Sequence, residues 1–362
     1  MSRGRAARGR SSNRHVGTVR PDRWRWHARA VPTALLIALA VLLLPLPPRA
    51  AAVVSAADWS QYRSGPARLG LNTQETVLSP STVSGLRQAW VTTAGDLVTE
   101  PAVVGGVVYV GSADRRVYAL NAATGAIVWT ATTGGRGLDP PAVADGVVYV
   151  RARDGNAYAL DAATGAIVWT ASIGGSPMFG LLPDRSSPAV TDGMVYVAGP
   201  YNGRLYALDA ATGATVWTAT RGDTVSGTLA VAAGIVYALL GRGLGAADLL
   251  ALNADTGAVV WTVPGDQWSS PSSVSPVVAN GVLYTGTING VLVARNPATG
   301  AVLWSDATMG GLDRSRYASL VVANGAVYAG RGVAVSAHRL QNPARRTRLD
   351  GPVRRPAPRL AH

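Results

Sequence analysis

Cysteine and lysine are absent from the 362-residue chain, and it holds only two glutamates, four histidines and one phenylalanine. Without cysteine the chain has no disulfide, no covalent c-type haem and no thiolate metal site. Without lysine it has neither a Schiff-base lysine nor a P-loop lysine. Three of the histidines, His15, His27 and His362, lie in the terminal tails, and His338 is the fourth. We therefore expect neither a histidine metal site nor a Ser-His-Asp triad.

Arginine is concentrated at the two ends of the chain. Residues 1–50 carry a net charge of +9 and residues 339–362 carry +6, whereas residues 51–338 carry −2. A total of +13 would ordinarily suggest a nucleic-acid partner. Because the charge lies in terminal runs, which are more often solvated or processed than functional, we expect no nucleic-acid binding.

The N-terminal region has the layout of a secretory signal. Residues 31–44 form an apolar run of 14 residues, preceded by a basic region and followed by a zone rich in alanine, with cleavage expected after Ala52 or Ala57. The alternative is an uncleaved anchor, but as a helix the run would reach roughly 21 Å, short of the ~30 Å hydrocarbon core. We therefore interpret residues 1–57 as a basic n-region, signal peptide and cleavage zone. This predicts a secreted or cell-envelope protein with no stable membrane span after processing.

One stretch, YALDAATGAIVW at 158–169, recurs along most of the chain. Near-copies end at Trp129, Trp217, Trp261 and Trp304. Corresponding glycines lie 40 to 48 residues apart, at Gly125, Gly165, Gly213, Gly257 and Gly300. A period in this range marks a repeat architecture.

Each repeat contains the signals of two hairpins. In the stretch itself, Asp161 is suited to accept hydrogen bonds from a turn that Gly165 closes with a positive φ. About 10 to 15 residues upstream, sequences such as VADGVVY place pairs such as Asp145-Gly146 at a two-residue primed turn. No stretch of the repeats has helical periodicity. We therefore predict an all-β fold, a β-propeller of four-stranded antiparallel blades.

The ends of the repeat region are complementary. Trp90 is in register with the later tryptophans but has no hairpin before it, whereas residues 320–340 supply three strands without a motif tryptophan. Together they predict one blade closed by N- and C-terminal strands. With five complete repeats this gives six blades, favoured over seven or eight, within residues 85–340. The lead-in at 58–84 is expected to pack across the ring, and the Arg- and Pro-rich tail at 341–362 to be disordered.

The pattern Ala-x-Asp-x-x-Thr-Gly-x-x-x-Trp, complete at 159–169 and 207–217, resembles the tryptophan-docking motif of pyrroloquinoline-quinone-type (PQQ-like) propeller repeats. The resemblance covers roughly residues 59–340, although the usual member of that family has more blades. It implies that the motif tryptophans are structural and pack flat against the neighbouring blade. These docking residues are Trp90, Trp129, Trp169, Trp217, Trp261 and Trp304.

Candidate binding residues lie in the links that join one repeat to the next, because these are the segments that do not repeat. In a propeller such links line one end of the central channel. They contain Arg136, Asp139, Phe179, Asp184, Arg185, Asp223, Asp266, Gln267, Trp268, Asp313, Arg314, Arg316 and Tyr317. Phe179 and Trp268 are the best candidates for stacking on a protein or small-molecule ligand at this face. The alternative is ordinary loop packing for the aromatics and solvated or mutually paired charge for the rest.

The resemblance also bears on activity. It implies that a PQQ-dependent oxidoreductase would need a calcium site of Glu, Asn and Asp beside a catalytic Asp, and often adjacent cysteines. Here the only glutamates, Glu75 and Glu100, precede the first complete repeat, and cysteine is absent. We therefore expect no catalytic residue and no cofactor, with PQQ and calcium as the disfavoured alternative. The favoured function is a non-catalytic binding or assembly scaffold; a small quinoprotein oxidoreductase and an extracytoplasmic sensor domain are the alternatives.

Overall fold

The computed structural model describes residues 58–70, 72, 77–79, 81–135, 138–174, 186–200, 202–220, 224–242, 246–265, 275–287, 291–306, 317–323, 325–331 and 334–339. All of them belong to one compact unit, Arg49–His362. Within these ranges the regular structure is strands and one short 3-10 helix, η1 (Val83–Gly85), so the all-β prediction is confirmed. The described ranges contain no helix with the length and apolar character of a membrane span. The predicted signal at 1–57 and tail at 341–362 lie outside them.

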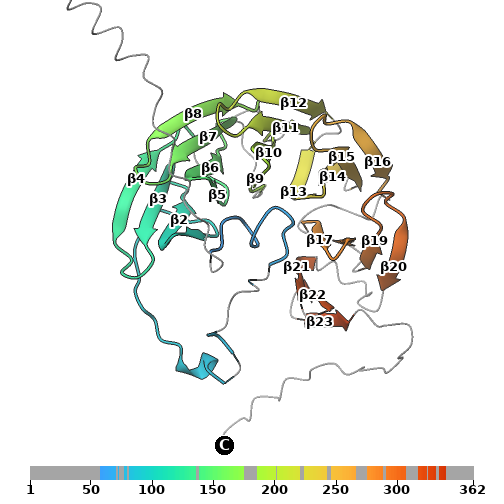
Figure 1. Cartoon of the computed structure of the whole chain (residues 1–362), viewed down its shortest axis with the longest axis horizontal. Helices are drawn as coiled ribbons and strands as arrows, with labels where there is room; N and C mark the ends of the chain where they lie inside the picture. The colour runs from blue at the N-terminus through green and yellow to red at the C-terminus, as the bar shows by residue number, and fades with distance from the viewer. Residues whose placement is uncertain are drawn as a thin grey trace, which may run out of the picture. The chain divides into compact units, whose positions relative to one another are not determined.

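The strands form six antiparallel sheets in chain order, as predicted (Figure 1). The first two sheets are β1 (Ala102–Val104), β2 (Val107–Gly111), β3 (Arg116–Asn121), β4 (Ile127–Thr132), and β5 (Ala142–Ala144), β6 (Val147–Arg151), β7 (Asn156–Asp161), β8 (Ile167–Ser172). The next two are β9 (Ala189–Thr191), β10 (Met194–Ala198), β11 (Arg204–Asp209), β12 (Thr215–Thr220), and β13 (Thr224–Ala232), β14 (Ile235–Arg242), β15 (Ala246–Asn253), β16 (Val259–Val263). The last two are β17 (Val277–Ala279), β18 (Val282–Gly286), β19 (Leu292–Arg295), β20 (Val302–Asp306), and β21 (Tyr317–Ala323), β22 (Ala326–Arg331), β23 (Ala334–Arg339).

The two hairpin turns of each repeat follow from their sequence. In the second sheet Asp145 and Gly146 both have positive φ, 49° and 72°, which a type I′ turn requires. In the next hairpin of that sheet, Asp161 Oδ1 accepts from the amides of Ala163 and Thr164 at 3.1 and 3.0 Å. Gly165 then takes a φ of 75°. The turns fix the register of all four strands.

A bulge in each outer strand turns its tryptophan towards the following sheet. In the second sheet Trp169 pairs with Ala159, and the register shifts between Ala159 and Leu160. The shift leaves Ile167 and Val168 exposed while Trp169 is buried. Extra residues in one strand commonly redirect side chains in this way.

Five tryptophans contact the next sheet through the same geometry. Trp129 Nε1 donates to the carbonyl of Ala162 at 2.9 Å, and a Cβ added at Gly165 would lie 2.6 Å from the Trp129 ring. The equivalent bonds are Trp90 to Ala122, Trp169 to Ala210, Trp217 to Ala254 and Trp261 to Pro297. Trp304 is 39% exposed. The part of the sixth repeat that would correspond to its partner begins after residue 339, outside the described residues.

The sixth sheet has three strands, β21, β22 and β23, and the predicted fourth strand is not formed in this structure. Trp90 docks on the first sheet, and Thr92 Oγ1 donates to the carbonyl of Gly125 at 2.6 Å. No ladder in the described part of the chain joins the residues around Trp90 to β23. The physical reason is that no tight turn connects these segments, so their pairing must close a loop of most of the chain without a hairpin to set its register.

Candidate functional site at the centre of the ring

Residues 58–70, which we call the plug, contact the innermost strand of all six sheets (Figure 1, blue). Six valines at equivalent positions, one in each inner strand, donate their backbone N–H to it. The bonds are Val103 to Trp59 O (2.8 Å), Val143 to Ser60 O (2.7 Å), Val190 to Gln61 Oε1 (3.0 Å), Val231 to Pro66 O (2.9 Å), Val278 to Ala67 O (3.1 Å) and Val322 to Leu69 O (3.4 Å). The plug therefore satisfies one inward-facing donor from every sheet.

The plug follows the inner strands by turning tightly upon itself. Gly70 N donates to Arg63 O at 2.9 Å, which closes a loop between these two residues. Arg63, Ser64 and Arg68 have φ values of 57°, 60° and 62°. Non-glycine residues adopt this region rarely, and such strain persists only when surrounding contacts impose it. The ring contacts of the plug supply that constraint.

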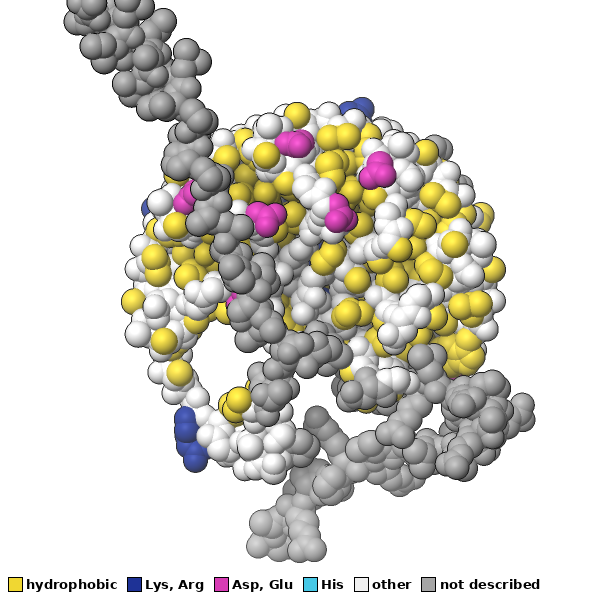
Figure 2. All heavy atoms as spheres, in the orientation of Figure 1, with side chains coloured by type: hydrophobic (Ala, Val, Ile, Leu, Met, Phe, Trp, Pro, Cys, Tyr) yellow, Lys and Arg dark blue, Asp and Glu magenta, His cyan; other side chains and the backbone are white. Residues whose placement is uncertain are grey.

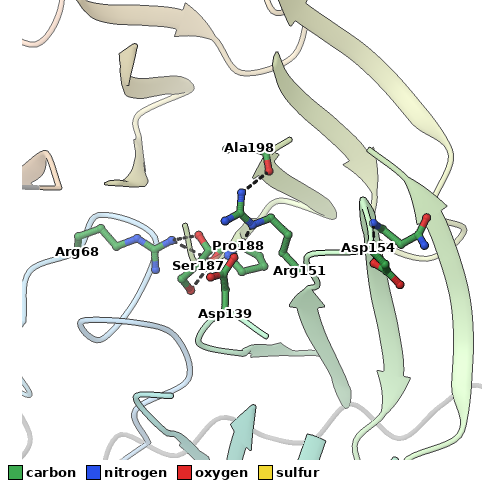
Figure 3. Close-up of polar contacts among 8 residues, drawn as sticks. Arg68, Asp139, Arg151, Asp154, Ser187, Pro188 and Ala198 are labelled. Atoms are coloured by element: carbon green, nitrogen blue, oxygen red, sulfur yellow. Dashed lines mark hydrogen bonds and ion pairs between the residues drawn. The ribbon is translucent and has the colours of Figure 1, made fainter. Parts of the chain in front are cut away.

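Arg68 is the central polar group of the plug. It is 0% exposed, and its Nε donates to Leu229 O at 2.8 Å. The remaining donors reach Tyr62 O at 2.9 Å. They also reach Ser187 O at 3.1 Å and Pro188 O at 2.9 Å (Figure 3). Burial lowers the pKa of the Arg68 guanidinium to about 9, so the group remains a cation at neutral pH. The carbonyl dipoles of the plug and of two sheets stabilise its charge.

Two further plug side chains extend these contacts to other sheets. Gln61 Nε2 donates to Val190 O at 2.8 Å, so its amide bonds both backbone groups of that valine. Arg63 Nη1 donates to Leu320 O in β21 at 3.0 Å, and its guanidinium lies 5.3 Å from the centre of the Tyr62 ring. Backbone and side chains of the plug together join strands that are distant in the sequence.

Asp139 is the only predicted ligand-face residue whose side chain the structure describes. It lies in the link before β5, but it is 5% exposed and its carboxylate pairs with Arg151 Nε at the end of β6. Arg151, 2% exposed, also donates from Nη1 to Ala198 O in the third sheet at 3.1 Å (Figure 3). This buried ion pair fits the alternative of mutually paired charge, and it lies within the second sheet while Arg151 reaches the third.

The other predicted link residues are not brought together by the described structure. Tyr317 begins β21, where its backbone pairs with Arg331. Outside the described residues lie Arg136, Phe179, Asp184, Arg185, Asp223, Asp266, Gln267, Trp268, Asp313, Arg314 and Arg316. Sequence reasoning missed Arg68, Gln61 and Arg151. A usable signal was present for the first two, because the lead-in places long polar side chains in a segment expected to cross the ring.

Tyrosines brace the links of the first two sheets. Tyr158 OH donates to Asp154 Oδ2 at 2.5 Å and accepts from Gly134 N, in the link from β4, at 3.0 Å. Tyr118 makes the same bond to Asp114 at 2.5 Å. Burial raises the pKa of Tyr158, and the hydrogen bond to Asp114 raises the pKa of Tyr118. Both tyrosines stay protonated at neutral pH, and Tyr158 holds Gly134 in the link between the first two sheets.

The described ring centre does not fit a quinone with calcium. Calcium takes six to eight oxygen ligands, commonly including several carboxylates. Within the described ranges no group of three or more His, Cys, Asp or Glu is placed to hold a metal ion. The axial donors, six valine amides and the Arg68 guanidinium, are bonded to the chain itself. We therefore assign no step to such a group.

The successive sheets and the repeated motif define a β-propeller of PQQ-like repeats. The family model described as outer membrane protein assembly factor BamB matches residues 74–199 and 183–356. The chain therefore belongs to this family. A search of curated proteins gave no significant match.

Solved structures that are similar to this chain include two dehydrogenases and BamB. Quinohemoprotein alcohol dehydrogenase from Comamonas testosteroni is 20% identical over 83% of this chain and 61% of its own, with a TM-score of 0.58. A europium-containing methanol dehydrogenase is 21% identical over 70% and 58%, with a TM-score of 0.56. BamB from Moraxella catarrhalis is 23% identical over 70% and 86%, with a TM-score of 0.44. At these identities the likeness to the two dehydrogenases shows the fold alone.

Proposed function

We propose that this protein is an exported, non-catalytic propeller that acts as a binding or assembly scaffold in the cell envelope. The observation that carries the proposal is the plug, because its bonds to all six inner strands fill the axis where a propeller enzyme would hold its ligand. Binding is then left to the two faces and the rim. Membership in a family named for an assembly factor supports the same function.

The link face is the surface we assign to a protein or small-molecule partner. Its links vary between repeats, and the bond between Gly134 and Tyr158 holds the base of the link between the first two sheets. Variable loops on a rigid scaffold are where binding residues concentrate. Within these links Phe179 and Trp268 are the aromatic residues we expect to anchor a partner.

A partner other than nucleic acid fits the surface charge. Figure 2 shows acidic and apolar side chains interspersed on the face turned to the viewer, with little arginine. Asp145 and Asp192 are exposed at the β5–β6 and β9–β10 turns, at the ends of the sheets opposite to the links. Nucleic acids are ordinarily bound by basic patches, which this face lacks in its described part.

Quantitative capture from envelope fractions tests the link face. The bait is the mature chain, with Trp268→Ala and Phe179→Ala as test variants and Thr130→Ala, an exposed outer-strand residue, as the matched control. Loss of an aromatic anchor should weaken capture at least about tenfold while the melting curve stays in place. Equal capture by all four proteins would contradict a partner site in these links.

The alternative is a small PQQ-dependent oxidoreductase. The observation that favours it is the fold similarity to quinohemoprotein alcohol dehydrogenase. Titration of the mature chain with PQQ and Ca²⁺, followed by calorimetry and absorbance, separates the two functions. The scaffold proposal expects no saturable binding. Binding of one quinone per chain would favour the oxidoreductase.

Export is tested at the N-terminus. Trp59 forms an antiparallel bridge with Val103, and Asp58 Oδ1 accepts from Gly105 N at 3.1 Å. A cleavage that retains these bonds leaves a mature protein that begins between Ala51 and Asp58. N-terminal sequencing of the protein from the native host should return such a start. A membrane-bound form that begins before Arg29 would favour the anchor.

A further inference from the structure

We propose that the ring centre is a peptide-binding socket and that the plug is its tethered ligand. The socket consists of the six inner-strand valine amides, which donate to five main-chain carbonyls and one side-chain amide oxygen of an irregular, tightly turned segment. Peptides commonly bind to sheets through main-chain hydrogen bonds, with side chains adding specificity. Here Gln61 and Arg68 supply that specificity, at the third and fourth sheets.

The connection of the plug to the ring supports its treatment as a ligand. Between Gly70 and β1 lie the 31 residues 71–101, so the plug is not the direct continuation of any sheet. Its position is therefore set by non-covalent contacts. A covalent connection raises the effective concentration of a ligand at its site without supplying the contacts that hold it there.

The hydrogen bonds define the chemical class of peptide that the socket takes. Pro66 accepts a hydrogen bond from Val231 N at 2.9 Å, and it has no N–H that would itself need an acceptor. In the described part of the chain, the acceptors of Arg68 are four backbone carbonyls and no carboxylate. The planar guanidinium of arginine can donate to several acceptors in different directions. The socket thus selects an arginine-containing peptide of the sequence WSQYRSGPARLG in the turned conformation of the plug.

The proposal is tested in the full mature chain carrying a protease site in place of residues 73–76. The intact protein folds first and is then cut, and denaturing gels establish that cleavage is complete. Gel filtration and native mass spectrometry then measure whether the plug peptide remains with the ring. The socket proposal expects it to co-elute, and expects excess labelled peptide of residues 58–72 to exchange into the site at one per ring.

Variants of the cut protein test which plug side chains the socket recognises. Arg68→Ala and Gln61→Ala should each release the plug at least about tenfold faster, because each removes bonds to the socket. Arg87→Ala is the matched control, since the Arg87 guanidinium bonds only neighbouring carbonyls, those of Ser84 and Leu86. Release of the wild-type peptide during gel filtration from a ring that keeps its melting curve would overturn the proposal. So would unfolding of the ring when the peptide exchanges, because the plug would then be part of the fold.

Discussion

The Nε of Arg68 donates to the carbonyl oxygen of Leu229, 2.8 Å away and 161 positions further along the chain. This bond joins the lead-in to the fourth sheet, and two more from the same guanidinium reach Ser187 and Pro188 before the third. We predict that Arg68→Ala lowers the free energy of unfolding by about 3 kcal/mol, because buried carbonyls lose their donors. Urea denaturation measures the effect.

The control for this prediction is Arg87→Ala, which removes an exposed arginine from the same lead-in region. Surface substitutions of this kind change stability by less than about 0.5 kcal/mol. Similar unfolding midpoints for Arg68→Ala, Arg87→Ala and the parent protein would show that the plug does not stabilise the ring.

The docking tryptophans offer a second test with two chemically identical substitutions. Trp169 is buried and its Nε1 bonds Ala210 O at 2.9 Å, whereas Trp304 is 39% exposed. Trp169→Ala should cost ~3 to 5 kcal/mol, the range for a buried aromatic. Trp304→Ala should cost on the order of 1 kcal/mol, because it returns less apolar surface to water. Equal losses measured by thermal and urea unfolding would contradict a stabilising role for the docking contact of Trp169.

Closure of the sixth sheet is the third prediction. In the second sheet Trp169 pairs with Ala159 and Thr170 with Tyr158. By the same register, Trp90 would lie opposite Ala337 and Val91 opposite Ser336. This pairing is not formed in the structure described above, and we predict that residues 87–93 can complete the sixth sheet in this register, since Trp90 already has the docking contact of a fourth-strand tryptophan.

An engineered disulfide tests this register in a chain with no other cysteine. Val91→Cys with Ser336→Cys should cross-link within one molecule under mild oxidation, because directly opposite residues meet disulfide geometry. Thr92→Cys with Ser336→Cys is the matched control, since adjacent residues of a strand point to opposite faces. Cross-linking between two molecules would indicate that a second copy supplies the strand. Equal yields for the two pairs would contradict the register.

Alkaline pH should weaken the fold through its buried tyrosines. Burial raises the pKa of Tyr237 to about 12, and its hydroxyl donates to Pro297 O at 3.2 Å. Above the ordinary tyrosine pKa near 10 the unfolded chain loses this proton while the folded chain keeps it. The stability linked to Tyr237 is therefore complete below pH 10 and is lost as pH rises to about 12. Tyr237→Phe should flatten the fall of the unfolding midpoint between these values; an unchanged slope would contradict the assignment.

The repeated part of the fold could be predicted because its signals are local. Asp145-Gly146 specifies a primed turn, and Asp161 with Gly165 specifies a second hairpin, so strand order and register follow from neighbouring residues. The sixth sheet could be predicted only in part. The fourth strand that the sequence predicts around Trp90 is not paired with β23 in this structure, and no turn links the two segments.

The ring centre was much less predictable than the repeats. The plug lacks any periodic pattern, and the bonds of Arg68 and Gln61 join residues more than a hundred positions apart. Asp139 was correctly placed in a link, but its partner Arg151 stands at a strand position that is Gly111 in the first sheet and Ala198 in the third, so the repeat gave no sign of an ion pair. Contacts between residues this far apart in the sequence form only when the ring assembles, so no local pattern predicts them.

Amide hydrogen exchange in the intact mature protein tests the filled axis most directly. The relevant peptides contain Val143 and Val231, whose amides donate to Ser60 O and Pro66 O. We predict that these amides are as protected as those of β6, and that Arg68→Ala raises their exchange rate without changing that of β8. Inner-strand amides that exchange as fast as the exposed turn at Ala163 in the parent protein would contradict an axis filled by the chain's own plug.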